Sequence, residues 1–237
     1  MTHEMWSRRI AALGQFRVDD PSAPVLGASD EHHLRTVLRA RDGEEIVVTN
    51  GAGAWSIGVV TTAALVRVSD VYVDERGAET TLYLAPLKGD RSEWAIAKVT
   101  ELGVSRIVPL LSQRVIVKMK GETGAKVVAR WRRIAAEACA QSRRTYDVII
   151  DEPARVADVA TDVAVTDFGG SSSWHGVRAV AIGPEGGWAP GEWGDERRRL
   201  RLGTSVLRGE TAGVAAATII AFANGSWGFT LQGDDNG

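Results

Sequence analysis

Two glycine-rich segments in the C-terminal half have the composition of ligand-binding loops. The first is Ile182-Gly183-Pro184-Glu185-Gly186-Gly187, and the second runs from Leu202-Gly203 to Gly209-Glu210. Glycine lets backbone amides and carbonyls approach a flat ligand closely, because it has no side chain. Each segment lies between a predicted strand and a predicted helix, and in an open parallel sheet ligands bind at the carboxyl ends of the strands. The two segments together predict a binding cleft formed largely by backbone.

The elements that position these loops are predicted from the alternation of short apolar runs with helical patterns. The runs are typical of buried strands, and strands that alternate with helices favour a parallel sheet covered on both faces, the α/β class. Strands are predicted at residues 81–87, 105–111, 147–150, 163–166 and 177–182. Helices are predicted at 91–102 with Gly103 as the C-terminal stop, at 124–141, from Pro190 onward, and at 210–224 as a nearly all-apolar final helix.

The N-terminal third shows a different pattern, with short strand-like runs between residues 15 and 73. Asn50-Gly51 lies between two runs rich in β-branched residues, which indicates a hairpin. The pattern predicts a small β-barrel followed by a linker at 74–79. We therefore expect one domain at residues 1–75 and a second at 78–237, with a frayed end at 233–237.

Composition excludes several classes of protein. The 237 residues are 44% hydrophobic and 24% charged, with a formal net charge of −2, as in ordinary folded domains. Cys139 is the only cysteine, so no internal disulfide can form, and four histidines without partner cysteines give no metal-binding pattern. No apolar run approaches the ~18 residues that span a bilayer, and the amino end lacks an export signal. We expect a cytoplasmic protein without a metal and without a membrane segment.

Positive charge is concentrated in one window. Between Arg114 and Arg144 nine basic residues stand against two acidic ones, a net charge of +7. In a helix over 124–141 the apolar side chains would share one face, while Lys126, Arg130 and Arg133 share another. The window predicts either a solvated helix surface or a track for RNA phosphates.

Five ordered segments between about residues 15 and 225 resemble the RsmE family of the SPOUT superfamily, the 16S ribosomal RNA uridine-N3 methyltransferases. The segments are His32-His33 through Arg39 with Gly43, Gly51 and Gly53; Lys98-x-x-Glu101-Leu102-Gly103-Val104 with Pro109 and Arg114; Glu137-Ala138-x-x-Gln141-Ser142-x-Arg144; Ile182 to Gly187; and Leu202-Gly203 through Val206-Leu207-Arg208-x-Glu210-Thr211-Ala212. Three residues depart from the family pattern: Val148 replaces proline, Trp188 replaces phenylalanine, and Ala189 replaces a helix-capping serine or threonine, which leaves Glu192 without its capping partner.

The resemblance implies a SPOUT-type parallel sheet whose C-terminal chain forms a trefoil knot, preceded by a PUA-like β-barrel. It also implies that three loops bind S-adenosyl-L-methionine as the cofactor. The residues expected to bind it are Thr166, Asp167, Ile182, Gly183, Pro184, Glu185, Gly186, Gly187, Leu202, Gly203, Val206, Leu207 and Arg208.

The implied reaction moves a methyl group to N3 of a uridine in 16S ribosomal RNA of the small subunit. Because that nitrogen carries a proton, a cation or a base nearby would favour the reactive form. Arg208 is the expected stabiliser of the uracil oxyanion, and Glu185 or Glu210 the expected base or orienting group.

Contacts with RNA are expected from basic residues of both domains, and the resemblance also implies a homodimer that uses the final apolar helix. The expected RNA-binding residues are Arg35, Arg39, Arg114, Lys126, Arg130, Arg133, Arg143 and Arg144. Two other interpretations stay open: a SPOUT methyltransferase acting on transfer RNA or on another ribosomal nucleotide, and an RNA-binding module that has lost catalysis.

Overall fold

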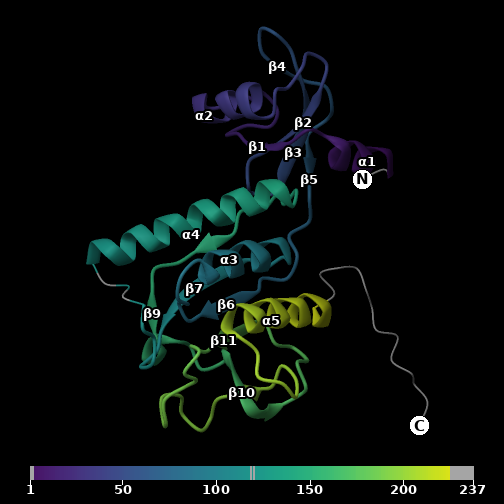
Figure 1. The fold of residues 1–237 in the computed structure, drawn as a ribbon. Coiled ribbons are helices and arrows are strands. Elements are labelled where there is room, and N and C mark those ends of the chain that lie inside the picture. Colours follow the sequence, from purple (N-terminus) through teal and green to yellow (C-terminus); the bar gives the residue numbers. More distant parts are fainter. Residues whose placement is uncertain (1–2, 118, 120, 225–237) are drawn as a thin grey trace, which may run out of the picture. The chain divides into compact units, whose positions relative to one another are not determined.

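The computed structural model describes residues 3–117, 119 and 121–224. The chain divides into two compact units (Figure 1). Unit 1 comprises Met1–Arg76 and Ala136–Asp147, and unit 2 comprises Gly77–Ala135 and Val148–Gly237. The sequence places a domain boundary at 75–78, whereas the structure also assigns residues 136–147 to the N-terminal unit. The expected frayed end at 233–237 lies outside the described residues, as do Lys118 and Lys120 of the basic window.

Unit 1 contains a five-stranded sheet. The sheet order is β1-β2-β3-β4, with β5 on β3; β1 and β2 are parallel and the other pairs antiparallel. The strands are β1 Gln15–Arg17, β2 Glu45–Thr49, β3 Ala54–Val60, β4 Leu65–Arg67 and β5 Tyr72–Val73, and the helices are α1 His3–Ala11, α2 Ala28–His32 and the π-helix η1 His33–Val37. The predicted hairpin is confirmed, because β2 and β3 pair directly across Asn50-Gly51.

Asp74 connects three segments of unit 1. Its carboxylate accepts hydrogen bonds from Arg9 of α1 at 2.9 Å, from the Trp55 indole of β3 at 2.9 Å and from the Thr145 hydroxyl at 2.8 Å. Arg9 is buried and also lies over the Trp55 ring, 4.6 Å from its centroid. A buried guanidinium is costly unless it is paired, so this ion pair fixes where α1 and the 136–147 segment attach. The first residue of the linker predicted at 74–79 is therefore part of the packed structure of unit 1.

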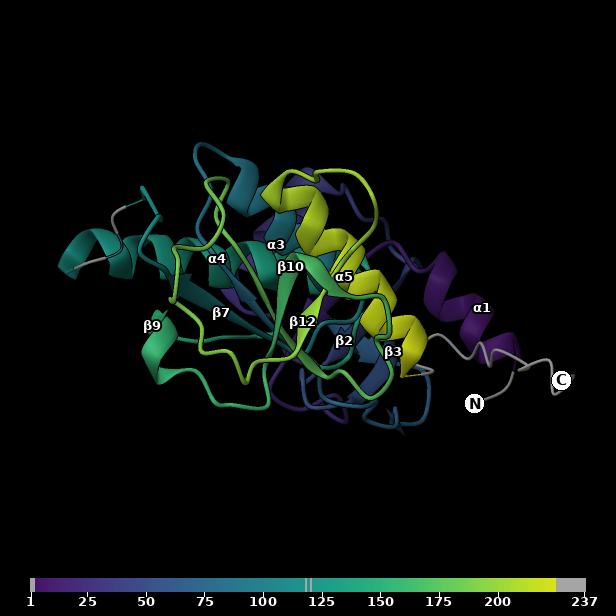
Figure 2. The ribbon, with the colours of Figure 1, turned by 90° about the horizontal axis from the view of Figure 1, so that it is seen from below.

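Unit 2 is built on a seven-stranded sheet in which every pairing is parallel, as predicted. The order is β12-β10-β11-β6-β7-β8, with β9 on β7. The strands are β6 Thr81–Leu84, β7 Arg106–Leu111, β8 Ile149–Ile150, β9 Ala154–Arg155, β10 Ala164–Ser171, β11 Ala179–Ile182 and β12 Arg199–Leu200. Figure 2 shows β12 beside β10 at one edge of the sheet.

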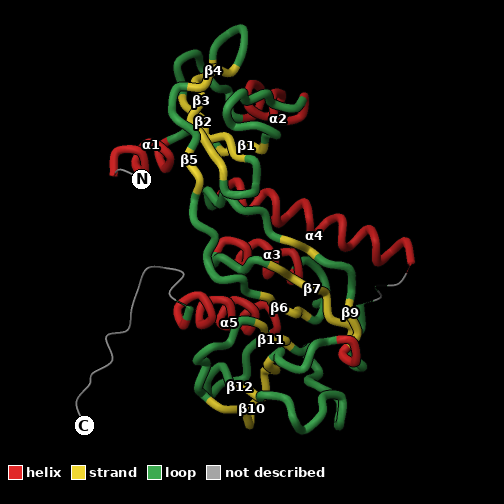
Figure 3. Tube along the Cα trace, turned by 180° about the vertical axis from the view of Figure 1, so that it is seen from behind, coloured by secondary structure: helices red, strands yellow, loops and turns green. Residues whose placement is uncertain are grey.

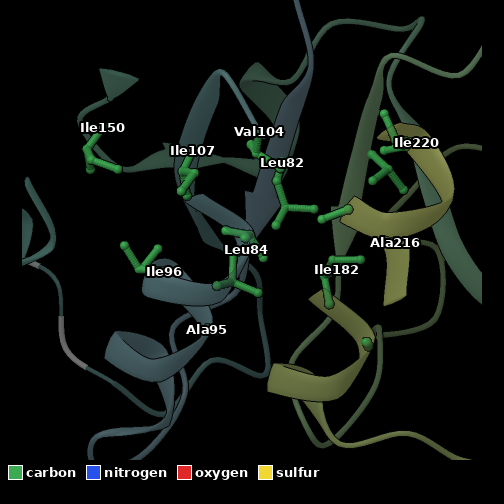
Figure 4. Packing of buried hydrophobic residues seen from close by; sticks show 14 of the residues in the cluster. Leu82, Leu84, Ala95, Ile96, Val104, Ile107, Ile150, Ile182, Ala216 and Ile220 are labelled. Carbon is green, nitrogen blue, oxygen red and sulfur yellow. The ribbon is translucent and has the colours of Figure 1, made fainter. Parts of the chain in front are cut away.

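Helices pack on one face of this sheet. They are α3 Arg91–Glu101, α4 Gly121–Gln141 and α5 Gly209–Ala223. Alternate strand residues point to this face, and Figure 4 shows Leu82 and Leu84 of β6 between Ile96 of α3 and Ala216 of α5. Trp131 and Ala135 of α4 are buried in the same cluster. The predicted apolar face of α4 is therefore confirmed at these positions.

The opposite face is covered mostly by loops and by the short 3-10 helix η2, Val156–Asp158. Val165 and Ala181 pack there against Trp193 and Trp188. The helix predicted from Pro190 onward is wrong: residues 183–198 form turns and loop, drawn in green between β11 and β12 in Figure 3. Three glycines, a proline and a lost cap within residues 186–191 favour turns over a helix. No helix in the described part of the chain is long and apolar enough to span a membrane.

Strands β10 and β12 approach each other so closely that one residue must be glycine. Both Thr166 and Ser171 of β10 pair with Leu200, so the intervening residues bulge around β12. A Cβ atom on Gly170 would lie 2.5 Å from the Leu200 nitrogen and 2.6 Å from the Arg199 carbonyl carbon. Such contacts are with backbone, which cannot rotate away.

We predict that Gly170→Ala separates β10 from β12 and lowers the free energy of unfolding by about 1–3 kcal/mol, the usual cost of overpacking. Gly169→Ala is the matched control, because a Cβ there meets nothing within 4 Å and the backbone is not left-handed. Denaturant unfolding of both variants measures the difference. Equal stabilities would contradict the close approach.

Candidate functional site

The bulged part of β10 and the loops that follow β11 and β12 surround a cavity of about 360 Å3. Because these strands are neighbours in a parallel sheet, their ends lie together at one edge. The volume is within the range of small-molecule sites. The cavity is lined by Thr166, Asp167, Phe168, Ile182, Gly183, Pro184, Glu185, Gly187, Trp188, Leu200, Arg201, Leu202, Gly203, Ser205, Val206, Leu207, Gly209 and Ala212.

The two glycine-rich segments thus meet in space. All the residues predicted to bind a cofactor line the cavity except Gly186 and Arg208. Seven lining residues were not predicted from the sequence: Phe168, Trp188, Leu200, Arg201, Ser205, Gly209 and Ala212. Position in the sequence could have indicated two of them, because Trp188 directly follows the first glycine segment and Phe168 directly follows the predicted residue Asp167.

Trp188 connects the first two walls of the cavity. Its indole donates a hydrogen bond to the Thr166 carbonyl at 2.8 Å, and its ring meets Trp193 edge to face at 5.2 Å. A Cβ on Gly183 would lie 3.0 Å from the Trp188 ring, so a side chain at 183 would press on the indole. The glycine at this position therefore permits the indole to close over the loop.

Glu192 stabilises the turn that follows, although its expected partner is missing. Its carboxylate accepts hydrogen bonds from the Ala189 amide at 2.9 Å and from the Gln113 amide at 2.5 Å. The expectation that Ala189 leaves Glu192 without a capping partner is therefore wrong, because the backbone of residue 189 supplies the donor itself. The bond to Gln113 links this turn to the loop after β7.

Arg114 also supports the glycine loop from the β7 side. Its guanidinium donates a hydrogen bond to the Gly186 carbonyl at 2.8 Å, and its aliphatic carbons lie beneath Gly186. Gly186 thus contributes to the loop's support rather than to the cavity lining. The structure gives Arg114 this supporting contact, and its expected role toward RNA stays a prediction.

Arg91, at the start of α3, is a residue that the sequence analysis missed. Its guanidinium forms an ion pair with Glu185 of the glycine loop and lies 3.9 Å from the Glu210 carboxylate at the start of α5. The hydrogen bond to Glu185 raises the pKa of Arg91. One oxygen of Glu210 is buried and accepts no hydrogen bond from the described residues. Arg91 thus brings together two carboxylates that the sequence separates.

Arg208 lies directly before α5 and does not line the cavity. Its side chain is exposed. Its carbonyl accepts a hydrogen bond from the Ala212 amide at 2.8 Å, which closes the first turn of the helix. No described side chain forms an ion pair with it. No described side chain therefore holds its guanidinium in place.

The basic face of α4 is exposed but partly neutralised. Lys126 pairs with Glu122 at 2.6 Å, and Arg130 pairs with Glu93 of α3 at 2.6 Å. Arg133 is also on the exposed side. Acidic partners within reach lower the net positive potential of this face, so charge counting along the sequence overstates it.

The expected RNA-binding residues of unit 1 differ in exposure. Arg39 is exposed, whereas Arg35 donates to the Thr61 carbonyl at 2.5 Å and pairs with Glu31 at 2.9 Å. Arg143 donates to the Ala12 carbonyl at 2.5 Å.

Burial lowers the pKa of both Arg143 and Arg144. Arg9 donates to the Arg143 carbonyl, and Gln15 donates to the Arg144 carbonyl at 2.6 Å. Hydrogen bonds thus tie both residues to the rest of unit 1, and their contact with RNA remains a prediction.

Among the described residues, no group of three or more His, Cys, Asp or Glu side chains is arranged to hold a metal ion. The cavity instead combines backbone groups with apolar side chains such as Leu202, Val206 and Leu207. Such a surface suits a flat organic ligand with an apolar face and a polar edge.

Curated relatives match most of the chain. It is 27% identical to the ribosomal RNA small subunit methyltransferase E of Bacillus subtilis, covering 91% of this chain and 96% of the relative. It is 28% identical to the protein of the same name from Mycobacterium tuberculosis, covering 88% and 90%.

Solved structures show the same fold. A methyltransferase from Legionella pneumophila, solved with bound S-adenosylmethionine, has a TM-score of 0.76 and 28% identity, with 87% of this chain and 96% of that chain covered. The ribosomal RNA small subunit methyltransferase E of Neisseria gonorrhoeae, also with bound S-adenosylmethionine, has a TM-score of 0.74 and 25% identity, with 88% and 96% covered.

Family models match both parts of the chain. The model described as an RNA methyltransferase PUA domain matches residues 27–64, and the one described as an RNA methyltransferase domain matches residues 74–221. The second match covers more than half of the sequence. Together with the resemblance found in its motifs, this match shows that the chain belongs to the RNA methyltransferase family.

Proposed function

We propose that the protein transfers a methyl group from S-adenosylmethionine to N3 of a uridine in 16S ribosomal RNA of the small subunit. The observation that carries this proposal is the convergence of the two glycine-rich segments on one cavity. Relatives named ribosomal RNA small subunit methyltransferase E, and neighbouring structures with bound S-adenosylmethionine, support the donor and the substrate.

The cavity fits the adenosine part of such a donor. Leu202, Val206 and Leu207 provide apolar surface for the faces of an adenine ring, and the loops at 183–187 and 202–207 provide peptide groups for its edge. Gly183 and Trp188 both line the cavity, and the indole packs directly on this glycine, so the two residues form one wall for a ligand. When bound, S-adenosylmethionine supplies an electrophilic methyl group on a sulfonium centre.

The protein's own residues would handle the proton and charge of the uracil. The N3 proton must leave, and negative charge then develops on the neighbouring carbonyl oxygens. The Arg208 side chain is exposed and forms no ion pair with any side chain between residues 121 and 224, so its guanidinium can face that charge. Glu185 lines the cavity and is therefore the first candidate to accept the N3 proton. Glu210 does not line the cavity and lies near Arg91 instead.

Several finer features belong to the same proposal. The loop bulging around β12 and the return of the chain into α5 are consistent with a trefoil knot, and the small sheet of unit 1 with a PUA-like barrel that contacts RNA. The proposed boundary between the PUA-like domain and the methyltransferase domain lies at residues 75–78.

Phe222 is an exposed apolar residue of α5, which supports a homodimer through this helix. A cytoplasmic location follows from the ribosomal substrate.

The first prediction concerns the donor and the product together. Calorimetry will show one S-adenosylmethionine site per chain, and small subunits from cells lacking the protein will gain one 3-methyluridine when treated with protein and donor. Mass mapping of the RNA identifies the nucleotide. Donor binding without transfer would favour a binding module, and a methyl group on another base would favour a different RNA methyltransferase.

The second prediction concerns Arg208. Arg208→Ala will lower kcat about 100-fold, as expected when one donor to a developing oxyanion is lost, with little change in the affinity for S-adenosylmethionine. Arg208→Lys, which keeps the charge, will recover part of the rate. Methylation at the parental rate by the alanine variant would remove Arg208 from the mechanism.

The third prediction concerns Arg91. Arg91→Ala will weaken S-adenosylmethionine binding about tenfold, because Glu185 loses the partner that orders the glycine loop and Glu210 is left with a buried, unpaired carboxylate. Arg91→Lys will be milder. Arg132→Ala is the control, since it removes an ion pair with Glu152 away from the cavity. Equal donor affinity for both alanine variants would contradict the role of Arg91.

A further inference from the structure

We propose that Phe168 is the platform on which the target uracil stacks when it enters the site. The inference rests on the proposed function, because it assigns a subsite within the same cavity. Phe168 lies in the irregular part of strand β10, between Thr166 and Ser171.

Strand β10 is interrupted where it passes the cavity. Thr166 and Ser171 both pair with Leu200 of β12, so residues 167–170 leave the regular ladder and bulge. Bulges are common next to functional sites, where they redirect side chains. At the far end of this one, Gly170 is fixed against the Leu200 backbone.

The backbone on either side of Phe168 is held in place. Asp167 pairs with Arg199 at 2.5 Å, and its other carboxylate oxygen accepts the Gly169 amide at 3.2 Å. Thr166 is held twice, since its hydroxyl donates to the Ala181 carbonyl at 3.0 Å and its own carbonyl accepts the Trp188 indole. The bulge is therefore a rigid support.

The Phe168 side chain lies outside the buried core of the described structure. It lines the cavity, yet it is 59% exposed and belongs to none of the buried clusters. No aromatic ring among the described residues stacks on it. A bulge anchored on both sides thus presents an uncovered phenyl ring at the cavity.

A nucleobase is the ligand that such a ring fits best. Proteins that bind unpaired bases commonly stack them on aromatic side chains, and enzymes that modify a base within structured RNA must first swing it out of the stack. The apolar residues Leu202, Val206 and Leu207 on the β12 loop are available for the donor's adenine. Phe168, on the β10 loop, is left for the second flat group in the reaction.

The test uses Phe168→Leu, which keeps apolar bulk but loses the ring, and Phe168→Trp, which keeps a ring. With small subunits as substrate, Phe168→Leu will lower kcat/KM for RNA about 5- to 150-fold, the range expected for one lost stacking contact. Its affinity for S-adenosylmethionine, measured by calorimetry, will stay within about twofold of the parental value. Phe168→Trp will remain near the parental kcat/KM.

Trp94→Leu is the matched control, because Trp94 is another exposed aromatic residue but does not line the cavity. The inference is overturned if Phe168→Leu keeps the parental kcat/KM, or if its loss appears equally in donor affinity, which would make Phe168 a platform for adenine. Failure of the parental protein to methylate small subunits would instead overturn the proposed function, and calorimetry of the Phe168 variants would then report on the donor alone.

Discussion

The site depends on the pairing of β12, β10 and β11 as parallel neighbours. This order brings the loops after residues 166, 182 and 200 to one edge of the sheet, although they are far apart in the sequence. The absence of a side chain at Gly170 allows β10 and β12 to approach closely at the point where the bulge ends. Any change that separates these strands moves two walls of the cavity at once, so packing within the sheet and ligand binding are coupled.

Charged residues support the loops from outside, while the cavity itself is largely apolar. Arg114 holds the Gly186 carbonyl, Arg91 holds Glu185, and Arg199 holds Asp167. None of these three arginines lines the cavity, so the backbone and the apolar side chains of the loops are left to face a ligand. The adenosine part of the proposed donor is uncharged and needs little charge from the protein, so we assign these arginines to ordering the loops. The glycine loops would otherwise be the least ordered part of the sheet's edge.

The sequence was sufficient to predict the parallel sheet, helices α3, α4 and α5, and the meeting of the glycine segments, because apolar periodicity and strand-to-helix order determine them. It was not sufficient for the helix expected after Pro190, where turn-forming residues and the Glu192 contacts favour irregular structure. Nor could it show that Arg143 and Arg144 have structural partners, that acids neutralise part of α4, or that Arg91 joins two carboxylates. Those depend on contacts between residues remote in sequence, which periodicity does not encode.

A crystal structure of the protein grown with S-adenosylmethionine will show whether the three loops form the donor site. We expect density for the donor between the loop at 183–187 and the loop at 202–207, with its adenine against Leu202 and Leu207. Density for the donor at any other place on the protein, with these loops unoccupied, would show that they are not the donor site.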